Sequence, residues 1–252
     1  MPFITQEISD NEGLTEIYRL RYKVYVDEWH FEKPEKYPNG LGSDAFDKSS
    51  IHFAAIDDNK RIIGTVCLIL NSMDGFPIEK HCHLNINRNE LLGENLAEIS
   101  MLTISKNYRR RAEDRYVYGP DEERRNFNDF NNYVNYAYAP KKTHWRSEDI
   151  YRHDFLKKKR VFQERRKRPE IIVSIYKAIY RESKKRGITQ WYAVMAKGLY
   201  ILLTKLGINF QPIGDPVDYY GIRTPYLCDI KKIEHDVSVK NQKLYEEFTE
   251  GL

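Results

Sequence analysis

Two neighbouring stretches of the chain carry side chains with the types and spacing that chemistry requires. Glu98-Ile99-Ser100 lies within an apolar run that predicts a strand over 96–105. Burial in such a strand disfavours the charged form of a carboxylate and raises its pKa toward neutrality, which suits a general base. Directly after the strand stands Lys106-Asn107-Tyr108-Arg109-Arg110-Arg111, and the guanidinium groups of its three arginines match phosphate and carboxylate ligands. The sequence therefore places a candidate base close to a candidate anion-binding site.

Each of these features also has a purely structural interpretation. Glu98 would equally serve as a buried partner of Arg21 or Arg61, because Glu-x-Ser is a short pattern. The arginine run would equally be a solvated basic turn. His81-Cys82-His83 puts two imidazoles on one face of an extended segment, but such adjacent residues fall short of a four-ligand zinc site. We therefore predict a loop there and no bound metal.

Composition limits the classes of function. The 252 residues are 41% apolar and 31% charged with a net charge of +4, which is typical of a globular protein and does not demand nucleic acid or anionic membrane as a partner. The apolar runs are shorter than the about 20 residues of a membrane-spanning helix, and the first residues show no signal-peptide pattern. Three scattered cysteines favour a reduced compartment. We therefore expect a cytoplasmic protein.

The elements that position the candidate residues are predicted from hydrophobic spacing. Apolar residues at helical intervals predict an amphipathic helix over 10–28, capped by Asp10 or Asn11. Apolar runs over 51–56 and 62–70 flank polar turn residues, which predicts a β-hairpin that precedes the strand of Glu98.

The C-terminal third alternates helices and strands. In order, the patterns predict a helix over 169–187, a strand over 189–195, a helix over 198–206, strands over 208–213 and 219–230, and a helix over 231–248. Together with the N-terminal half, this predicts an α/β (α+β) fold with a mixed central sheet flanked by helices. We expect a single domain over residues 1–252, with a basic, Tyr-rich surface insertion at about 112–168.

Three stretches together resemble a known family. They are a helix with Arg21, Tyr25 and Phe31 followed by Asp44-Ala45-Phe46-Asp47; Glu98-Ile99-Ser100-Met101 running into the arginines; and Trp191-Tyr192-Ala193-Val194-Met195 with the Leu206-Gly207-Ile208-Asn209-Phe210 stretch, Gly221 and Arg223. The combination is similar to the PEP-CTERM/exosortase-system-associated acyltransferases. That group is similar to the long-chain N-acyl amino acid synthases and the acyl-homoserine-lactone (autoinducer) synthases of the GNAT superfamily. The resemblance implies a GNAT fold, in which a splayed strand pair holds the acyl-thioester carrier in a V-shaped gap.

The resemblance also implies an acceptor pocket. Arg21, Tyr25 and Phe31 stand at the spacing with which the autoinducer synthases place Arg, Phe and Trp around their acceptor. Asp44 and Asp47 match the D-x-x-D pattern, which in those synthases helps to order the N-terminal segment around the acceptor.

Two positions depart from that pattern. Met101 and Cys67 stand where the relatives usually carry arginine. Both missing cations would lie near the acceptor or the acid pair. The acceptor is therefore expected to differ from that of the autoinducer synthases, and lost activity is the alternative.

N-acylation by such a protein needs a base for the amine, a site for the oxyanion and a proton for the leaving thiolate. Glu98 is the candidate base, acting through a water. Ser100 or Tyr192 would protonate the thiolate, although a strand tyrosine also suits the core. Backbone N–H groups after Glu98 would hold the thioester oxygen, at Leu102, Thr103 and Ile104.

The donor side is expected to take an acyl-phosphopantetheine as co-substrate, with no bound cofactor. Arg109, Arg110 and Arg111 would bind its phosphate or the acidic face of a carrier. The chain lacks the Gly-rich Q/R-x-x-G-x-G/A sequence that cradles a pyrophosphate, which favours acyl carrier protein over coenzyme A. The basic runs at 157–160 and 165–168 suit docking of acyl carrier protein, peripheral contact with the inner membrane, nucleic acid or simply a solvated helix face. Among these partners we do not expect nucleic acid.

We therefore predict an N-acyltransferase. It would move a fatty acyl group from acyl carrier protein, or from coenzyme A, to the amine of an amino acid or similar small molecule. An acyl-homoserine-lactone synthase that uses S-adenosylmethionine is the alternative enzyme. A GNAT-fold module that binds an acyl or nucleic-acid ligand without turnover is the non-enzymatic alternative.

Overall fold

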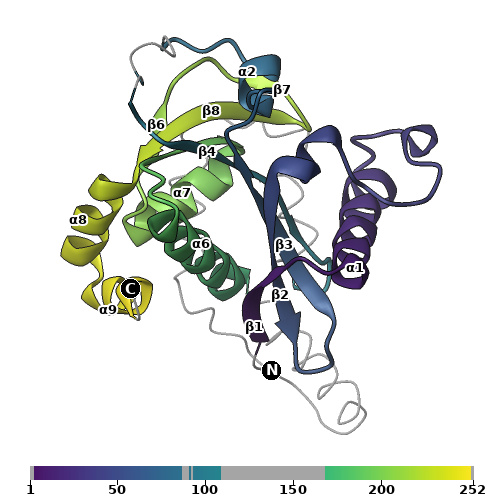
Figure 1. Cartoon of the computed structure of the whole chain (residues 1–252), viewed down its shortest axis with the longest axis horizontal. Helices are drawn as coiled ribbons and strands as arrows, with labels where there is room; N and C mark the ends of the chain where they lie inside the picture. Colours follow the sequence, from purple (N-terminus) through teal and green to yellow (C-terminus); the bar gives the residue numbers. More distant parts are fainter. Residues whose placement is uncertain (1–2, 87–90, 92, 109–167, 251–252) are drawn as a thin grey trace, which may run out of the picture.

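A computed structural model describes residues 3–86, 91, 93–108 and 168–250 (Figure 1). The predictions for Arg109, Arg110 and Arg111, and for the basic insertion up to residue 167, lie outside the described residues. None of the helices in the described ranges is both long and apolar enough to cross a membrane.

A mixed sheet forms the centre of the fold, in the order β1-β2-β3-β4-β5-β8-β6 with β7 paired to β8. The parallel pair is β4 with β5, and the other described pairings are antiparallel. The strands are β1 Phe3–Ile8, β2 Ser50–Asp57, β3 Ile62–Leu70, β4 Leu96–Ile104, β5 Gln190–Met195, β6 Gln211–Pro212, β7 Val217–Asp218 and β8 Ile222–Asp229. The predicted hairpin (β2 and β3) and the predicted mixed sheet are confirmed.

Helices cover both faces of this sheet. Figure 1 shows α6 and α1 on opposite sides of it. The helices are α1 Asn11–Tyr22, α2 Pro77–His81, α6 Arg168–Lys185, α7 Lys197–Leu206, α8 Ile230–Lys240 and α9 Gln242–Thr249, with a π-helix η1 Lys23–Glu28 and 3-10 turns η2 Pro34–Lys36 and η3 Ala45–Ser49. Asp10 caps α1, because its Oδ1 accepts the Gly13 N–H at 2.8 Å. The predicted first helix thus continues through η1.

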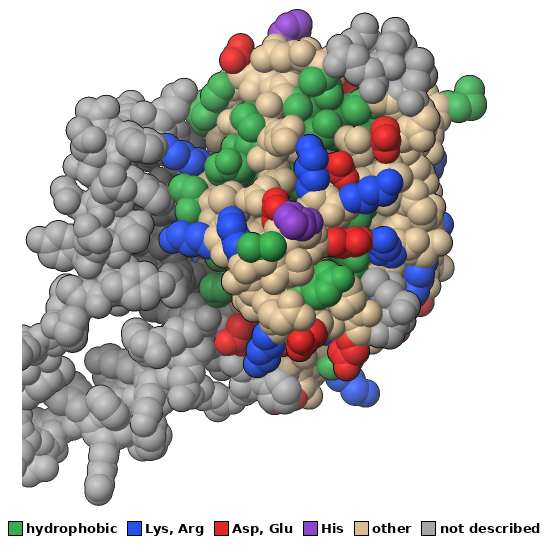
Figure 2. Space-filling model, turned by 90° about the vertical axis from the view of Figure 1, so that its left-hand side faces the viewer, with side chains coloured by type: hydrophobic (Ala, Val, Ile, Leu, Met, Phe, Trp, Pro, Cys, Tyr) green, Lys and Arg blue, Asp and Glu red, His purple; other side chains and the backbone are tan. Residues whose placement is uncertain are grey.

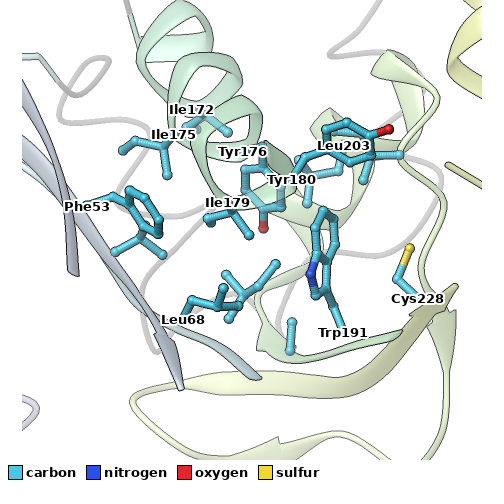
Figure 3. Packing of buried hydrophobic residues seen from close by; sticks show 14 of the residues in the cluster. Phe53, Leu68, Ile172, Ile175, Tyr176, Ile179, Tyr180, Trp191, Leu203 and Cys228 are labelled. Atoms are coloured by element: carbon cyan, nitrogen blue, oxygen red, sulfur yellow. The ribbon is translucent and has the colours of Figure 1, made fainter. Parts of the chain in front are cut away.

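The larger hydrophobic core lies between α6 and the sheet (Figure 3). Ile172, Ile175 and Ile179 recur at helical spacing and point the same way, so one stripe of α6 is buried. Trp191 on β5 packs beneath them at 1% exposure, and its Nε1 donates to Ser183 Oγ at 2.8 Å. The indole therefore buries its apolar area without leaving its N–H unsatisfied.

Three local predictions need correction. The strand β1 was not predicted, because its single buried residue, Ile8, gives no alternating signal. The predicted strand over 208–213 is only β6, since Ile208 and Phe210 both turn into the core and Asn209 Nδ2 bonds Asp236 at 2.6 Å. The predicted helix over 231–248 is two helices, α8 and α9.

The face that carries α8 and α9 mixes both signs of charge. Figure 2 shows lysine, arginine, aspartate and glutamate side chains interspersed on it, with hydrophobic side chains between them. Opposite charges also pair locally there, as Lys184 Nζ does with Glu234 Oε1 at 2.8 Å. Mixed charge of this kind is typical of a solvated surface.

Candidate active site

The parallel strands β4 and β5 pair over only part of their lengths. Their ladder runs from Leu96–Gln190 to Ile99–Ala193 and stops there, although β4 continues to Ile104 and β5 to Met195. The outer halves of the two strands therefore separate. Backbone groups of β4 beyond Ile99 are released from pairing with β5 and become available to a ligand.

A β-bulge lies in β4 at the start of this separation. Its register with β3 passes from Thr103–Thr65 to Ser100–Cys67, so Met101 and Leu102 together oppose one residue of β3. Met101 has φ +54°, a left-handed conformation that costs a residue other than glycine about 1–2 kcal/mol. Strain of this kind persists where the surroundings enforce it, and it clusters at functional sites.

The separated strands open into a cavity of about 130 Å³, here called the inner cavity. Apolar side chains from β4, β5, α6, α7 and η1 form one part of its wall. Aromatic and polar side chains from η1, the bulge and the β7–β8 segment form the other. The lining residues are Val24, Tyr25, Trp29, Phe31, Ser100, Met101, Leu102, Thr103, Ile104, Ile172, Val194, Ala196, Leu199, Tyr219, Tyr220 and Arg223.

The aromatic wall joins two distant segments of the chain. Tyr25 at the middle of η1 lies 5.2 Å from Tyr220 and 6.2 Å from Phe31, measured between ring centroids. Trp29 stacks on Phe31 at 5.8 Å with planes only 4° apart. Offset and edge-on contacts of this kind hold rings firmly in place, so the wall is pre-formed.

A buried ion pair supports this wall from behind. Arg21 is 1% exposed and its Nη1 bonds Asp47 Oδ1 at 2.7 Å, while Nη2 lies 3.2 Å from His52 Nδ1. Asp47 Oδ2 in turn accepts the Asp44 N–H, and Asp44 Oδ1 accepts the Phe46 N–H. Arg21 and the acid pair thus form one network that fixes η3 against α1.

Glu98 lies beside the inner cavity without lining it. It is 1% exposed, and its Oε2 accepts the Ile78 N–H of α2 at 2.9 Å. Burial raises the pKa of Glu98 to about 8, and the Ile78 hydrogen bond opposes that shift only in part. The interpretation of Glu98 as a partner of Arg21 or Arg61 is wrong, because these pair with Asp47 and Asp57.

The other predicted residues divide between the cavity and its surroundings. Tyr192 pairs with Glu98 across β4 and β5 and packs edge-on against Phe76, so it belongs to the packed layer under the site. Cys67 is also buried there, and burial raises the pKa of its thiol to about 12. The predicted residues that the structure gathers around the inner cavity are Tyr25, Phe31, Ser100, Met101, Leu102, Thr103 and Ile104.

Among the aromatic and charged lining residues, four were not predicted as site residues. Trp29 follows the last residue of η1 and stands four residues after Tyr25, and Tyr219, Tyr220 and Arg223 flank the turn at Gly221. The spacing of Trp29 from Tyr25 is a helical interval, which is a signal that could have found it. The two tyrosines reach the site through sheet topology, which the sequence pattern does not contain.

Comparisons with known proteins agree with this architecture. Residues 20–118 match the family model described as an acetyltransferase (GNAT) domain. Similar solved structures include FeeM, an N-acyl amino acid synthase from uncultured soil microbes, at 10% identity and TM-score 0.55 over 96% of this chain and 98% of that chain. BjaI, a coenzyme A-dependent acyl-homoserine lactone synthase solved with SAM and isopentyl-CoA, is 15% identical with a TM-score of 0.56, over 96% of this chain and 90% of that chain. The acyl-homoserine lactone synthase LasI is 13% identical with a TM-score of 0.51, over 91% of this chain and 90% of that chain.

These likenesses establish the fold. At such identities a structural match speaks for architecture alone, and the chain has the GNAT fold that its sequence predicted. A search of curated proteins found no significant match. The association with a PEP-CTERM/exosortase system stays a prediction.

Proposed function

We propose that this protein is an acyltransferase that moves an acyl group from a thioester carrier directly to the amine of an amino acid or other small molecule. The observation that carries the proposal is the inner cavity at the split between β4 and β5, where a strained bulge meets one apolar and one aromatic wall. The match of residues 20–118 to a GNAT acetyltransferase domain supports the same class of reaction.

The bulge suits the reacting carbonyl. The amine nitrogen attacks the thioester carbon, a C–N bond forms, the C–S bond breaks, and the sulfur leaves as a thiolate. Negative charge on the carbonyl oxygen needs fixed donors, and we assign this role to backbone N–H groups among Leu102, Thr103 and Ile104, in the part of β4 that does not pair with β5. Removal of one such donor typically slows an acyl transfer by about 10² to 10³.

Proton transfer would involve Glu98 and a tyrosine. Glu98 lies behind the cavity wall, so we assign it the role of base through an intervening water or hydroxyl. Burial, and after it the Glu98 carboxylate, raise the pKa of Tyr219, which lines the inner cavity. A phenol held neutral in this way is a proton donor, and Tyr219 joins Ser100 as a candidate to protonate the leaving thiolate.

The apolar part of the cavity suits the acyl chain. Leu102, Ile104, Ile172 and Leu199 come from β4, α6 and α7 and offer no charge. We propose either acyl carrier protein or coenzyme A as the carrier of the acyl group, since the arginines assigned to carrier binding lie outside the described residues.

Product analysis tests this function. The purified full-length protein is incubated with acyl carrier protein thioesters or acyl-CoA of several chain lengths, and with a pool of amino acids, amines and S-adenosylmethionine. Mass spectrometry should find a new N-acyl amine. An acylated lactone would instead establish the autoinducer-synthase alternative. Absence of any acyl-amine with both donors would contradict the proposal.

A further inference from the structure

A second hollow adjoins the inner cavity on its aromatic side. It is an open depression of about 680 Å³, which we call the outer hollow. It shares Trp29, Phe31, Tyr219 and Tyr220 with the inner cavity, so these four side chains line both spaces and lie where the two meet. The remaining lining residues are His30, Glu32, Lys36, Asp44, Ala45, Phe46, His81, Asp218 and Gly221.

The ionisable lining of the outer hollow carries an excess of carboxylates. Glu32 Oε1 accepts from Lys36 Nζ and from the Tyr220 hydroxyl, each at 2.7 Å, so the ammonium of Lys36 is already paired. Asp44 and Asp218 add two further carboxylates, and among the described residues of the lining Lys36 is the one lysine or arginine. A concave surface with such an excess attracts cations and repels anions.

Asp44 would gain from a cation in the outer hollow. Burial, and after it the neighbouring Asp47 carboxylate, raise the pKa of Asp44. A positive group in the outer hollow would stabilise the ionised form of Asp44 and bring this pKa back down.

Aromatic faces complete the lining. Five rings surround the space, and one of them already holds a cation: Lys80 Nζ lies 4.6 Å from the centroid of Phe46. His81 stacks on Tyr219 at 4.6 Å, which holds that ring at the boundary between the two spaces. Carboxylates next to aromatic faces bind alkylammonium groups through charge and cation–π attraction together.

We propose that the acyl acceptor is a diamine or polyamine that carries no carboxylate. One ammonium group sits in the outer hollow against Asp44, Asp218 and the rings, while the other amine, in its neutral form, passes Tyr219 and Tyr220 to the thioester at the β4 bulge. This inference rests on the proposed acyl transfer and narrows its acceptor. The carboxylate of an amino acid would be repelled by the carboxylates that already line the outer hollow.

Three acceptors of equal chain length test the inference with the full-length protein. Cadaverine has two amines, pentylamine lacks the second amine, and lysine adds a carboxylate to the cadaverine skeleton. Because a hydrogen bond to a charged group contributes about 1.5–3 kcal/mol, cadaverine should exceed both others in kcat/KM by about tenfold or more. Lysine or pentylamine at or above cadaverine would overturn the inference while the acyl transfer stands.

A matched pair of variants locates the effect. Asp218→Asn removes one charge from an exposed residue of the lining, and should raise the KM for cadaverine about tenfold without changing that for pentylamine. Asp215→Asn removes another exposed charge three residues earlier, outside the lining, and should leave both KM values unchanged. Equal effects of the two variants would place the ammonium elsewhere and overturn the inference.

Calorimetry without a donor separates this inference from the proposed function. Cadaverine should bind the protein more tightly than lysine does, and Asp218→Asn should weaken it. That result together with no acylated product from any acceptor would sustain the ligand class and contradict acyl transfer. Absence of cadaverine binding at millimolar concentration would overturn the ligand class.

Discussion

The two faces of the sheet bury different kinds of side chain. Against α6 the core is largely apolar, and its buried polar groups find partners close by, as Trp191 Nε1 does with Ser183 Oγ and the Tyr108 hydroxyl does with Asp57. Against α1 and α2 the structure buries Arg21, His52 and Glu98, each under 5% exposed. Charged groups lose hydration on burial, so apolar residues would fill this face at least as stably. The difference indicates that the α6 face mainly supports the fold and gives the inner cavity an apolar wall through Ile172, whereas the α1 face holds the buried charged groups beside the site.

Breaking the buried ion pair should give the largest effect. Arg21→Met leaves Asp47, with a side chain 7% exposed, as an uncompensated buried carboxylate. The free energy of unfolding should fall by about 3–5 kcal/mol, measured by urea denaturation. The double variant Arg21→Met with Asp47→Asn should recover part of the loss. Arg186→Ala, which breaks an exposed pair with Glu182, should cost under about 1 kcal/mol. Equal losses of unfolding free energy in Arg21→Met and Arg186→Ala would show that the buried pair of Arg21 and Asp47 stabilises the fold no more than an exposed pair does.

Glu98→Gln should remove the base while keeping its hydrogen bond. The amide oxygen still accepts the Ile78 N–H, so α2 stays in place. If Glu98 receives the amine proton, kcat should drop by about 10² or more with KM for the donor unchanged. Circular dichroism and the melting temperature serve as the control for the fold. A wild-type kcat in a folded variant would leave Glu98 with a structural role only.

Features that depend on residues close together in the sequence could be predicted, whereas features that depend on contacts between distant segments could not. The hairpin, β4 and α6 were predictable, because runs of buried residues at a regular spacing produce them. The contacts of the buried network of Arg21, Asp44 and Asp47 were harder to predict. Arg21, Asp44 and Asp47 were singled out through a family resemblance, but the bond between Arg21 and Asp47 joins α1 to η3, and no local pattern encodes it.

The outer hollow lay beyond sequence reasoning for the same reason. Glu32 and Tyr220 are 188 residues apart, and their hydrogen bond exists because η1 and the β7–β8 turn converge on the split between β4 and β5. Met101 shows a second limit. Its left-handed backbone follows from the bulge, which depends on the register of β4 against β3. Its residue type gives no hint of this, since methionine rarely adopts that conformation.

The buried carboxyl group of Glu98 should make both the stability and the activity of the protein depend on pH. Its pKa of about 8 in the folded protein exceeds the ordinary 4.5, so the neutral form stabilises the fold below about pH 4.5 and this contribution is lost as the pH rises toward 8. Activity should move in the opposite direction, with kcat rising about fivefold from pH 7 to 8 as the carboxylate forms. Glu98→Gln is the control, because any pH dependence that it retains belongs to the amine. Identical pH profiles of stability and of kcat in both proteins would contradict a titrating Glu98.

The smallest effect should come from the apolar face and should leave catalysis untouched. Ile179 on α6 is fully buried, and Ile179→Val removes one methylene from the core in Figure 3. The loss of buried area and packing should lower the free energy of unfolding by about 0.5–1.5 kcal/mol. Because Ile179 lines neither the inner cavity nor the outer hollow, kcat and KM should equal those of the wild type at a temperature where both proteins are folded. A shift in KM for the acceptor would show that packing under α6 is transmitted to the site, and the two faces of the sheet would then be coupled through β4, which contributes residues to both.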